Sequence, residues 1–196
     1  NLNTADPSEE LGFDPRQLRN KYQQERDKRL RRDGNSQYQE IKGDYAGFIE
    51  DPYIEETLQR EPLTDTVDIV IIGGGFGGLI TGARLRELGF ENIRLIEKGA
   101  DFGGTWYWNR YPGAACDTES YIYLPLLEET GYLPHQKYAQ APEILAHSKH
   151  IAKHYDLYRD ACLQTEVTAM QWDATKQNWI INTNRGDVMR AHYVIM

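Results

Sequence analysis

The chain has 196 residues, 40% of them hydrophobic, and a formal net charge of −8. This length and composition allow one large globular domain, or one domain and an additional segment. The negative charge argues against a nucleic-acid-binding protein, because such proteins bind phosphates through a positive field.

Cysteine usage and apolar runs narrow the class further. The two cysteines, Cys116 and Cys162, form no CxxC pattern, so neither a disulfide framework nor a zinc site is predicted. No apolar run approaches the roughly 18 residues of a membrane span, and the first residues do not resemble a secretion signal. We therefore expect a cytoplasmic protein that binds no metal, no membrane and no nucleic acid.

Residues 1–62 differ from the rest and predict a helical N-terminal extension. Asp14 can cap a helix, Pro15 suits its first position and Gly34 can end it. Residues 15–33 carry eight Lys or Arg and three acidic residues. The apolar stripe of this helix is thin and holds Leu18, Tyr22 and Leu30. The pattern favours a solvated helix that docks on the body through the stripe, while a partner-binding or membrane-surface helix stays open.

A strand–helix–strand pattern begins at Thr66. The run TVDIVII is followed by the glycine cluster GGGFGG, a helical stretch and a second short strand, NIRLIE. This order within about 30 residues is typical of a βαβ unit with a parallel sheet. Residues 63–196 are therefore predicted to be the N-terminal part of a Rossmann-like α/β domain.

The second half of this region predicts one helix and three strands. YAQAPEILAHSKHIAKHYDL has apolar residues at helical spacing, whereas LQTEVTAMQWD, NWIINT and VMRAHYVIM alternate like strands joined by the turns ATKQ and NRGD. The three strands predict a C-terminal β-meander. Residues 193–196 form an apolar strand of the buried type, so we expect the domain to continue beyond Met196 in a longer polypeptide.

The glycine cluster follows the GxGxxG spacing of dinucleotide-binding loops. Gly73 would allow the tight turn, Gly75 the approach of a pyrophosphate, and Gly78 the close packing of helix on strand. The helix N-terminus beyond supplies free N–H groups for phosphates. Glu97 lies 24 residues after Gly73, at the end of the second strand, where an acid can bind ribose hydroxyls. This loop is therefore predicted to bind FAD or NAD rather than NADP.

An aromatic segment after the second strand favours FAD over NAD. It reads GGTWYWNRYPGAACDTESYIY, and together with GGGFGG, LIEKG and APEIL it closely resembles Baeyer–Villiger monooxygenases, flavoproteins that convert ketones to esters or lactones. The resemblance runs from about Val67 to Met196. The N-terminal extension resembles, more loosely, that of members acting on bulky or macrocyclic ketones.

The resemblance implies a set of cofactor-binding residues. The glycine loop would bind the FAD pyrophosphate, Glu97 the adenosine ribose, and the backbone of Val167 the adenine. Asp117 would lie beside the flavin and the nicotinamide and act as the catalytic residue of this segment. The complete implied set is Gly73, Gly75, Phe76, Gly77, Gly78, Glu97, Lys98, Gly104, Thr105, Trp106, Tyr107, Trp108, Ala115, Cys116, Asp117, Tyr123 and Val167. Many relatives carry arginine in place of Ala115 and serine in place of Gly77.

The family's reaction is implied by the same resemblance. NADPH reduces FAD, the reduced flavin and O2 form a C4a-peroxide, and this attacks the ketone. Asp117 would orient an arginine that steadies the negative charge. That arginine, a second GxGxxG and the FxGxxxHxxxW fingerprint are absent from this chain, and we expect them beyond Met196. The segment alone is then expected to hold FAD without turnover.

Two other functions stay open at this stage. A related class B flavin monooxygenase would oxygenate an amine nitrogen or a sulfur, and a flavin-binding module would lack catalysis. The RYPGAACDTES segment favours the ketone-oxidising family over the first alternative.

Some residues near these motifs receive structural interpretations. His147, His150 and His154 share a helix face without further metal ligands nearby, so a mostly exposed face that binds no metal is expected. Cys116 is expected to be structural, and Arg110 to fix its loop through backbone hydrogen bonds or a carboxylate.

Alternating aromatic residues suggest extended segments. Trp106 and Trp108 would then share one face, as would Tyr121 and Tyr123. Trp106 is expected to touch the flavin, with core packing as the alternative. Asp117 could instead cap the turn that follows it.

Overall fold

The computed structural model describes residues 12–39 and 41–196, and the chain divides into two compact units, Asn1–Glu50 and Asp51–Met196. The first unit contains helix α2 (Pro15–Arg29) and the 3-10 helices η1 (Gly34–Gln37) and η2 (Gly43–Ile49). The backbone N–H of Arg16 donates to Asp14 Oδ1 at 2.8 Å, so the predicted N-terminal cap is confirmed. None of the residues of α2 is buried.

Helix α2 ends earlier than the sequence predicts. Its last residue is Arg29, and Leu30 has extended backbone, whereas an end at Gly34 was expected. The Arg31 side chain binds the carboxylate of Asp33 two residues later. Residues two apart point to opposite sides of an α-helix, so this ion pair requires a turn and is incompatible with a continued helix.

The second unit is an α/β domain whose sheet has the order β3-β2-β1-β6-β5-β4. Its strands are β1 (Thr66–Ile72), β2 (Ile93–Ile96), β3 (Ala161–Cys162), β4 (Val167–Asp173), β5 (Asn178–Thr183) and β6 (Val188–Ile195). β1 pairs in parallel with both β2 and β6, whereas β4, β5 and β6 form an antiparallel meander. The predicted Rossmann-like unit and meander are therefore confirmed.

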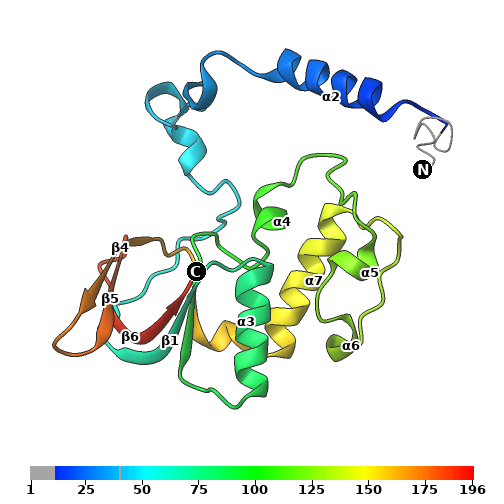
Figure 1. The fold of residues 1–196 in the computed structure, drawn as a ribbon. Helices are drawn as coiled ribbons and strands as arrows, with labels where there is room; N and C mark the ends of the chain where they lie inside the picture. The colour runs from blue at the N-terminus through cyan, green and yellow to red at the C-terminus, as the bar shows by residue number, and fades with distance from the viewer. Residues whose placement is uncertain (1–11, 40) are drawn as a thin grey trace, which may run out of the picture. The chain divides into compact units, whose positions relative to one another are not determined.

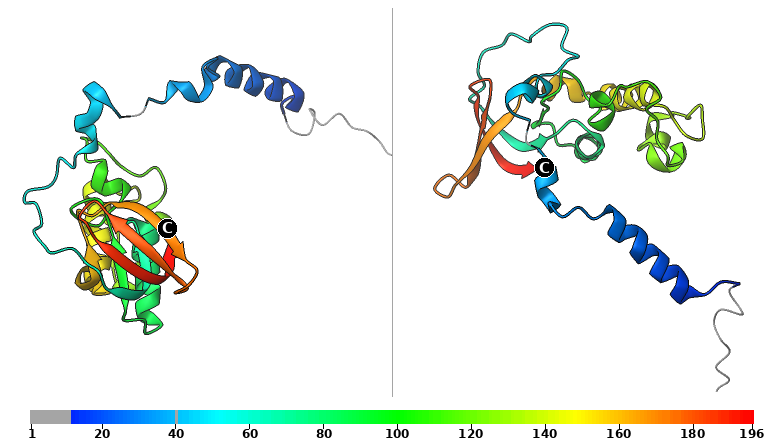
Figure 2. Two further views of the ribbon diagram at one scale, coloured as in Figure 1. Left: turned by 90° about the vertical axis from the view of Figure 1, so that its left-hand side faces the viewer. Right: turned by 90° about the horizontal axis from the view of Figure 1, so that it is seen from above.

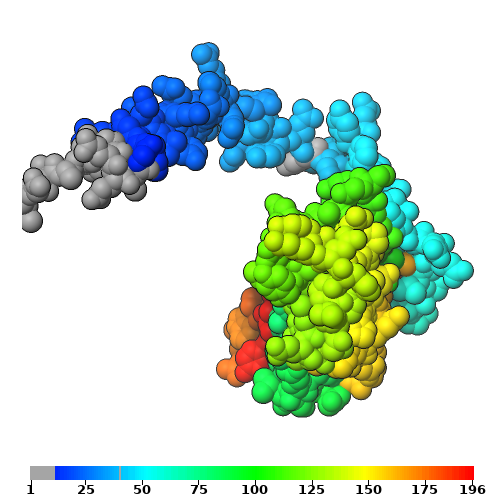
Figure 3. Space-filling model, turned by 90° about the vertical axis from the view of Figure 1, so that its right-hand side faces the viewer, coloured from blue at the N-terminus to red at the C-terminus, as the bar shows by residue number. Residues whose placement is uncertain are grey.

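The helices of this unit lie to one side of the strands, and the β4–β5 hairpin lies to the other (Figures 1 and 2). They are α3 (Phe76–Glu87), α4 (Thr105–Trp108), α5 (Ser120–Tyr123), α6 (Leu127–Thr130), α7 (Ala141–His154) and η3 (Leu157–Asp160). Figure 3 shows the face covered by α7 and the segment before it, coloured green to yellow.

Alternation along β1 divides the core between the two faces of the sheet. Ile69 and Ile71 pack with Leu79 of α3 and Ile151 of α7. Val70 packs on the other face with residues of the meander, Ile181, Met189 and Ala191 among them. Because every second residue of a strand points to the same face, the three consecutive apolar residues Ile69, Val70 and Ile71 are explained by burial on both sides.

The first residues of the second unit, from Asp51 to Asp65, are bound to the rest of that unit. Arg60 donates from Nη1 and Nη2 to the two carboxylate oxygens of Asp187 at 2.6 and 2.7 Å, and the backbone N–H of Leu63 donates to the same carboxylate at 2.8 Å. Asp187 is only 1% exposed. The residues from Asp51 to Asp65 are thus tied to the β5–β6 turn before β1 begins.

Three expectations about side-chain placement are wrong. α4 and α5 are helical turns and not extended segments, so Trp106 and Trp108 point to different sides, as do Tyr121 and Tyr123. A single turn of four residues is too short for its period to be read from alternation.

The other two corrections concern residues expected to be exposed or buried. His147 is 1% exposed because it packs between Tyr132 and the chain at Pro125, whose carbonyl lies 2.7 Å from its Nε2. Tyr193 and Met196 are 68% and 87% exposed, so the end of the chain is not the buried strand that the sequence predicts, and Met196 lies beyond the last residue of β6.

Within residues 12–39 and 41–196, no helix has the length and apolar character needed to cross a bilayer. The same described part of the chain holds no group of three or more His, Cys, Asp or Glu arranged for a metal ion.

Candidate functional site: a glycine-walled groove beside an aromatic turn

The first glycine loop connects β1 to α3. Gly73 has φ +103°, a conformation that side chains disfavour, and its N–H donates to the Ile96 carbonyl at 2.8 Å. A Cβ on Gly78 would lie under 3.0 Å from the Gly73 carbonyl oxygen, so α3 packs as closely as glycine allows. Gly73 and Gly78 are thus required by the fold itself.

Gly75 and Gly77 differ from these two glycines. Gly75 caps α3 with φ −80°, and a Cβ there would meet only the Cα of Gly104, at an ordinary 3.5 Å. A Cβ on Gly77 would meet nothing within 4 Å. Neither position needs glycine for backbone conformation or packing, so the bare backbone at Gly75 is left available to a molecule outside the chain.

A second glycine loop lies directly on the first. The N–H of Gly103 donates to the Gly74 carbonyl at 2.9 Å, and a Cβ on Gly104 would lie 2.7 Å from the Cα of Gly75. Gly104 has φ +53° and begins helix α4. Helix α4, which carries Trp106, Tyr107 and Trp108 and is called the aromatic turn below, is therefore held in backbone contact with the first glycine loop.

The side chain of Glu97 is hydrogen-bonded both to the first glycine loop and to the segment that leads into the second. Its Oε2 accepts from the N–H of Gly74 at 2.5 Å and its Oε1 from the N–H of Gly99 at 2.6 Å, and the residue is 7% exposed. A buried carboxylate satisfied by two backbone donors is a stable arrangement. Glu97 thus has a structural role that the sequence did not reveal, and ribose binding by this residue stays a prediction.

A groove of about 300 Å³ lies where the glycine loop faces the end of β6. Its walls include Gly73, Gly75, Gly77 and Gly78 on one side and Ile195 and Met196 on the other. The chain connects β1 to β2 on one side of β1 and reaches β6 on the other, so this is the switch point of the sheet. Ligands of open α/β sheets bind at such points, outside the carboxyl ends of the strands.

The residues predicted for the adenosine end of FAD lie together. The N–H of Thr165 donates to the Glu97 carbonyl at 2.9 Å, which brings the start of β4 at Val167 beside the end of β2. Lys98 is exposed and its Nζ lies 3.5 Å from Glu166. Glu97 and Lys98, at the end of β2, therefore lie near Val167 at the start of β4, although these two places are far apart in the sequence.

The aromatic turn α4 is fixed on one side by Tyr123. Trp106 Nε1 donates to the Tyr123 hydroxyl at 2.9 Å, and the two rings are perpendicular with centroids 5.9 Å apart. Phe76 packs against the other side of Tyr123 at 5.5 Å. Phe76 is the first residue of α3, so Tyr123 positions the indole of Trp106 relative to the glycine loop. The neighbouring Thr105 is exposed and Trp108 is half-buried.

The Ala115–Asp117 loop presents one free carboxylate. Cys116 is buried and its N–H donates to the Ala139 carbonyl at 3.0 Å, while Ala115 and Asp117 are exposed. No residue in the described part of the chain donates a hydrogen bond to the Asp117 side chain, whereas the N–H of Thr118 lies 3.4 Å from Cys116 Sγ. Cys116 packs in the core, and its role stays a prediction, whereas Asp117 is accessible to a ligand.

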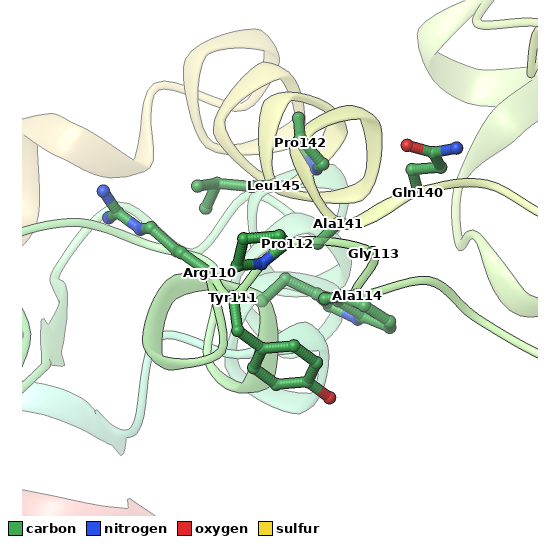
Figure 4. Close-up of a pocket in the computed structure, with 10 residues that line it drawn as sticks. Arg110, Tyr111, Pro112, Gly113, Ala114, Gln140, Ala141, Pro142 and Leu145 are labelled. Atoms are coloured by element: carbon green, nitrogen blue, oxygen red, sulfur yellow. The ribbon is translucent and has the colours of Figure 1, made fainter.

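A second cavity of about 280 Å³ lies between the RYPG turn and the start of α7. Pro112 and Leu145 face one another across it, with Arg110 at one end and Gln140 at the other (Figure 4). Trp106 contributes to its wall. The cavity therefore adjoins the aromatic turn.

Arg110 fixes its loop as expected. Its Nε donates to the Tyr107 carbonyl at 2.9 Å, and its guanidinium lies over two tyrosine rings, 3.9 Å from the centroid of Tyr53 and 4.5 Å from that of Tyr107. Tyr53 and its neighbour Asp51 were missed by sequence reasoning. Gly74 was also missed, although the run of three glycines was a signal for it.

The comparisons with known proteins agree with this geometry. Residues 71–134 match the model of the NAD(P)-binding Rossmann-like domain. Pentalenolactone D synthase of Streptomyces exfoliatus is 56% identical over 180 residues, 91% of this chain and 30% of the relative. A Baeyer–Villiger monooxygenase of Streptomyces coelicolor is 50% identical over 178 residues, covering 91% and 30%. The FAD-binding monooxygenase hmp7 of Hypomyces subiculosus is 47% identical over 185 residues, covering 93% and 30%.

Solved structures show the same likeness. The polycyclic ketone monooxygenase of Thermothelomyces thermophila superposes with a TM-score of 0.80 at 35% identity, covering 91% of this chain and 31% of that one. A steroid monooxygenase bound to NADP gives 0.60 at 41% identity, covering 66% and 25%.

By fold, the second unit is an α/β domain of the NAD(P)-binding Rossmann-like type. Its sequence and its structural neighbours assign the chain to the Baeyer–Villiger monooxygenase family. The chain spans about 30% of the length of the curated relatives that it matches.

Proposed function

We propose that the complete protein is an FAD- and NADPH-dependent monooxygenase that inserts one atom of O2 beside a ketone carbonyl, giving an ester or lactone. The observation that carries this proposal is Gly75, a motif glycine that the fold does not require. It lines a groove at the switch point of the sheet and lies next to Gly104, the residue that caps α4. A diphosphate there would contact bare backbone and the N-terminus of α3.

The residues present fit FAD in kind and in order along the sheet. Gly73–Gly78 would hold the diphosphate, Glu97, Lys98 and Val167 would contact the adenosine half, and Gly104–Trp108 with Tyr123 would contact the flavin ring. Trp106 and Tyr123 already fix each other by a hydrogen bond, so this wall is preorganised. When bound and reduced by NADPH, the flavin supplies the electrons that activate O2.

Ala115, Cys116 and Asp117 would lie near the nicotinamide of NADPH. Asp117 has the exposure and the unoccupied carboxylate that this role needs. Its task would be to orient a cation that steadies negative charge during oxygen transfer. That cation would come from another part of the complete polypeptide. Ala115 carries no charge of its own, so the loop itself supplies no arginine at this position.

Polycyclic ketones are the substrate class that we propose to test first. The polycyclic ketone monooxygenase guides this choice, and both it and pentalenolactone D synthase match 91% of the chain. These matches are long enough to extend beyond the second unit, so the likeness includes part of the N-terminal extension.

The test uses the complete protein, FAD, NADPH and O2 with cyclic and polycyclic ketones, and identifies products by mass spectrometry. We expect ester or lactone with one added oxygen atom, which ¹⁸O2 would label. An amine oxide or sulfoxide from matched amines and sulfides, with no ester from any ketone, would assign the protein to the other class B reaction. A protein that binds FAD without oxygenating either class would be a flavin-binding module.

A further inference from the structure

The strongest unassigned feature is a cluster around the hydroxyl of Tyr107. Tyr107 lies in α4 and was predicted to line the flavin together with Thr105, Trp106 and Trp108, but its side chain is only 1% exposed. Its hydroxyl donates to Asp51 Oδ2 at 2.6 Å and accepts from the N–H of Ala100 at 3.0 Å. Burial, and then the neighbouring Asp51 carboxylate, raise the pKa of Tyr107 above its ordinary value, so this hydroxyl stays protonated as a donor.

Asp51 makes three hydrogen bonds with its two oxygens. Oδ2 accepts from Tyr107 and also from the N–H of Ala100 at 3.0 Å, while Oδ1 accepts from the N–H of Tyr53 at 2.9 Å. The last bond bends the chain so that the Tyr53 ring packs edge-on against Tyr107, with centroids 5.7 Å apart. Asp51 thus joins the start of the second unit to the loop after β2.

Arg110 also holds α4, through the ring and the carbonyl of Tyr107. The guanidinium of Arg110 lies over the rings of both Tyr53 and Tyr107, and its Nε donates to the Tyr107 carbonyl. Stacking of a cation on aromatic faces is favourable and is stronger for Arg because its planar group matches the rings. Tyr107 therefore has its hydroxyl, its ring and its carbonyl all fixed.

Tyr107 in turn determines where the second glycine loop lies. A Cβ on Gly99 would meet the Tyr107 ring at 2.8 Å, and a Cβ on Gly103 would meet Tyr107 Cβ at 3.2 Å. Gly104, the residue at backbone contact with Gly75, caps the same turn. A shift of Tyr107 would consequently move Gly104 from the glycine loop and Trp106 from Tyr123.

We propose that Asp51, which lies outside the nucleotide-binding motifs, is a positioning residue for the flavin-binding turn, acting through the hydroxyl of Tyr107. The proposal rests on the proposed FAD binding. Tyr53 and Arg110 complete the cluster through their contacts with the Tyr107 ring. The segment before β1 is thereby part of the cofactor site's support, in addition to linking the two units.

The test is a double-mutant cycle in the complete protein with Asp51→Asn, Tyr107→Phe and the combined variant. Asparagine offers one acceptor oxygen in place of two, so it cannot accept from both Tyr53 and Tyr107. FAD dissociation constants are measured by quenching of flavin fluorescence on the flavin-free protein. We expect each single variant to weaken FAD binding about tenfold, and the double variant to be no weaker than either, since both changes disrupt the same hydrogen bond between Asp51 and Tyr107.

Asp65→Asn is the matched control. Asp65 pairs with Arg94 at 2.6 and 2.8 Å and lies in the same chain segment, before β1. It is seven residues from Ile72, which places it roughly 23 Å from the glycine loop along an extended strand. We expect this variant to lose stability on heating and to keep its FAD affinity.

The outcomes separate the two proposals. If the unaltered protein binds no FAD, the proposed function fails. If it binds FAD and Asp51→Asn binds equally tightly, or if the effects of Asp51→Asn and Tyr107→Phe simply add, the positioning role of Asp51 is wrong. Equal loss of FAD affinity in Asp65→Asn would also overturn it, because general destabilisation would then explain the effect.

Discussion

Replacing Gly78 by alanine tests how closely α3 packs on the turn after β1. The added Cβ would lie under 3.0 Å from the Gly73 carbonyl oxygen, 3.1 Å from its carbon and 3.6 Å from Ile71 Cγ2. The closest two atoms are backbone, so relief requires the helix or the turn to move. Overpacking of this kind costs about 1–3 kcal/mol or more, against a gain of up to about 1 kcal/mol in helix propensity.

The net expectation for Gly78→Ala is a loss of about 2 kcal/mol. For a unit of this size that corresponds to a fall in melting temperature of roughly 4–8 °C. Circular dichroism during heating of the complete, flavin-free protein measures it. The control is Gly77→Ala, whose Cβ would meet nothing within 4 Å and which should be neutral or slightly stabilising. A Gly78→Ala variant that melts with the unaltered protein would refute the packing argument.

Two further predictions concern buried polar groups. Burial opposes ionisation of Asp187, but Arg60 and the hydrogen bonds from Leu63 and Thr183 hold the pKa of its carboxyl below the usual value. Asp187→Ala should therefore cost about 3 kcal/mol in urea unfolding, because it leaves Arg60 half-buried and unpaired; a loss under about 0.5 kcal/mol, typical of a surface change, would contradict this. Burial lowers the pKa of His147 below its ordinary value. The neutral, buried imidazole therefore contributes its full stability above about pH 6.5. This contribution is lost as the pH falls, by at most about 1.4 kcal/mol per pH unit. His147→Phe should reduce the loss of stability between pH 7.5 and 5.5, and equal losses in both proteins would show that His147 does not titrate there.

The sequence predicted the parts of the fold whose signal is local and periodic. The glycine spacing after VDIVII defined the turn between β1 and α3, and the turns ATKQ and NRGD defined the meander. The roles of Gly73 and Gly78 followed from the same spacing, because positive φ and close packing are properties that glycine alone supplies. The FAD contacts assigned by resemblance stay predictions.

The parts that sequence reasoning missed depend on contacts between distant residues. Asp51 and Tyr107 are 56 residues apart, and the segment around Asp51 has no motif that indicates a partner. The aromatic residues of α4 and α5 alternate like a strand, yet each segment is one helical turn fixed by its surroundings. His147 was expected on an exposed face because helical periodicity does not show that Tyr132 would stack on it at 4.7 Å.

The central claim is that the first glycine loop is shaped for a diphosphate rather than for the fold alone. Titration of FAD into the flavin-free complete protein and into its Gly75→Ala variant tests this directly. An alanine Cβ at this position meets only Gly104 Cα at 3.5 Å, so the variant should melt like the unaltered protein. It should nevertheless bind FAD at least about tenfold more weakly, which corresponds to about 1.4 kcal/mol. A variant that keeps full FAD affinity, or an unaltered protein that binds no FAD, would contradict the account.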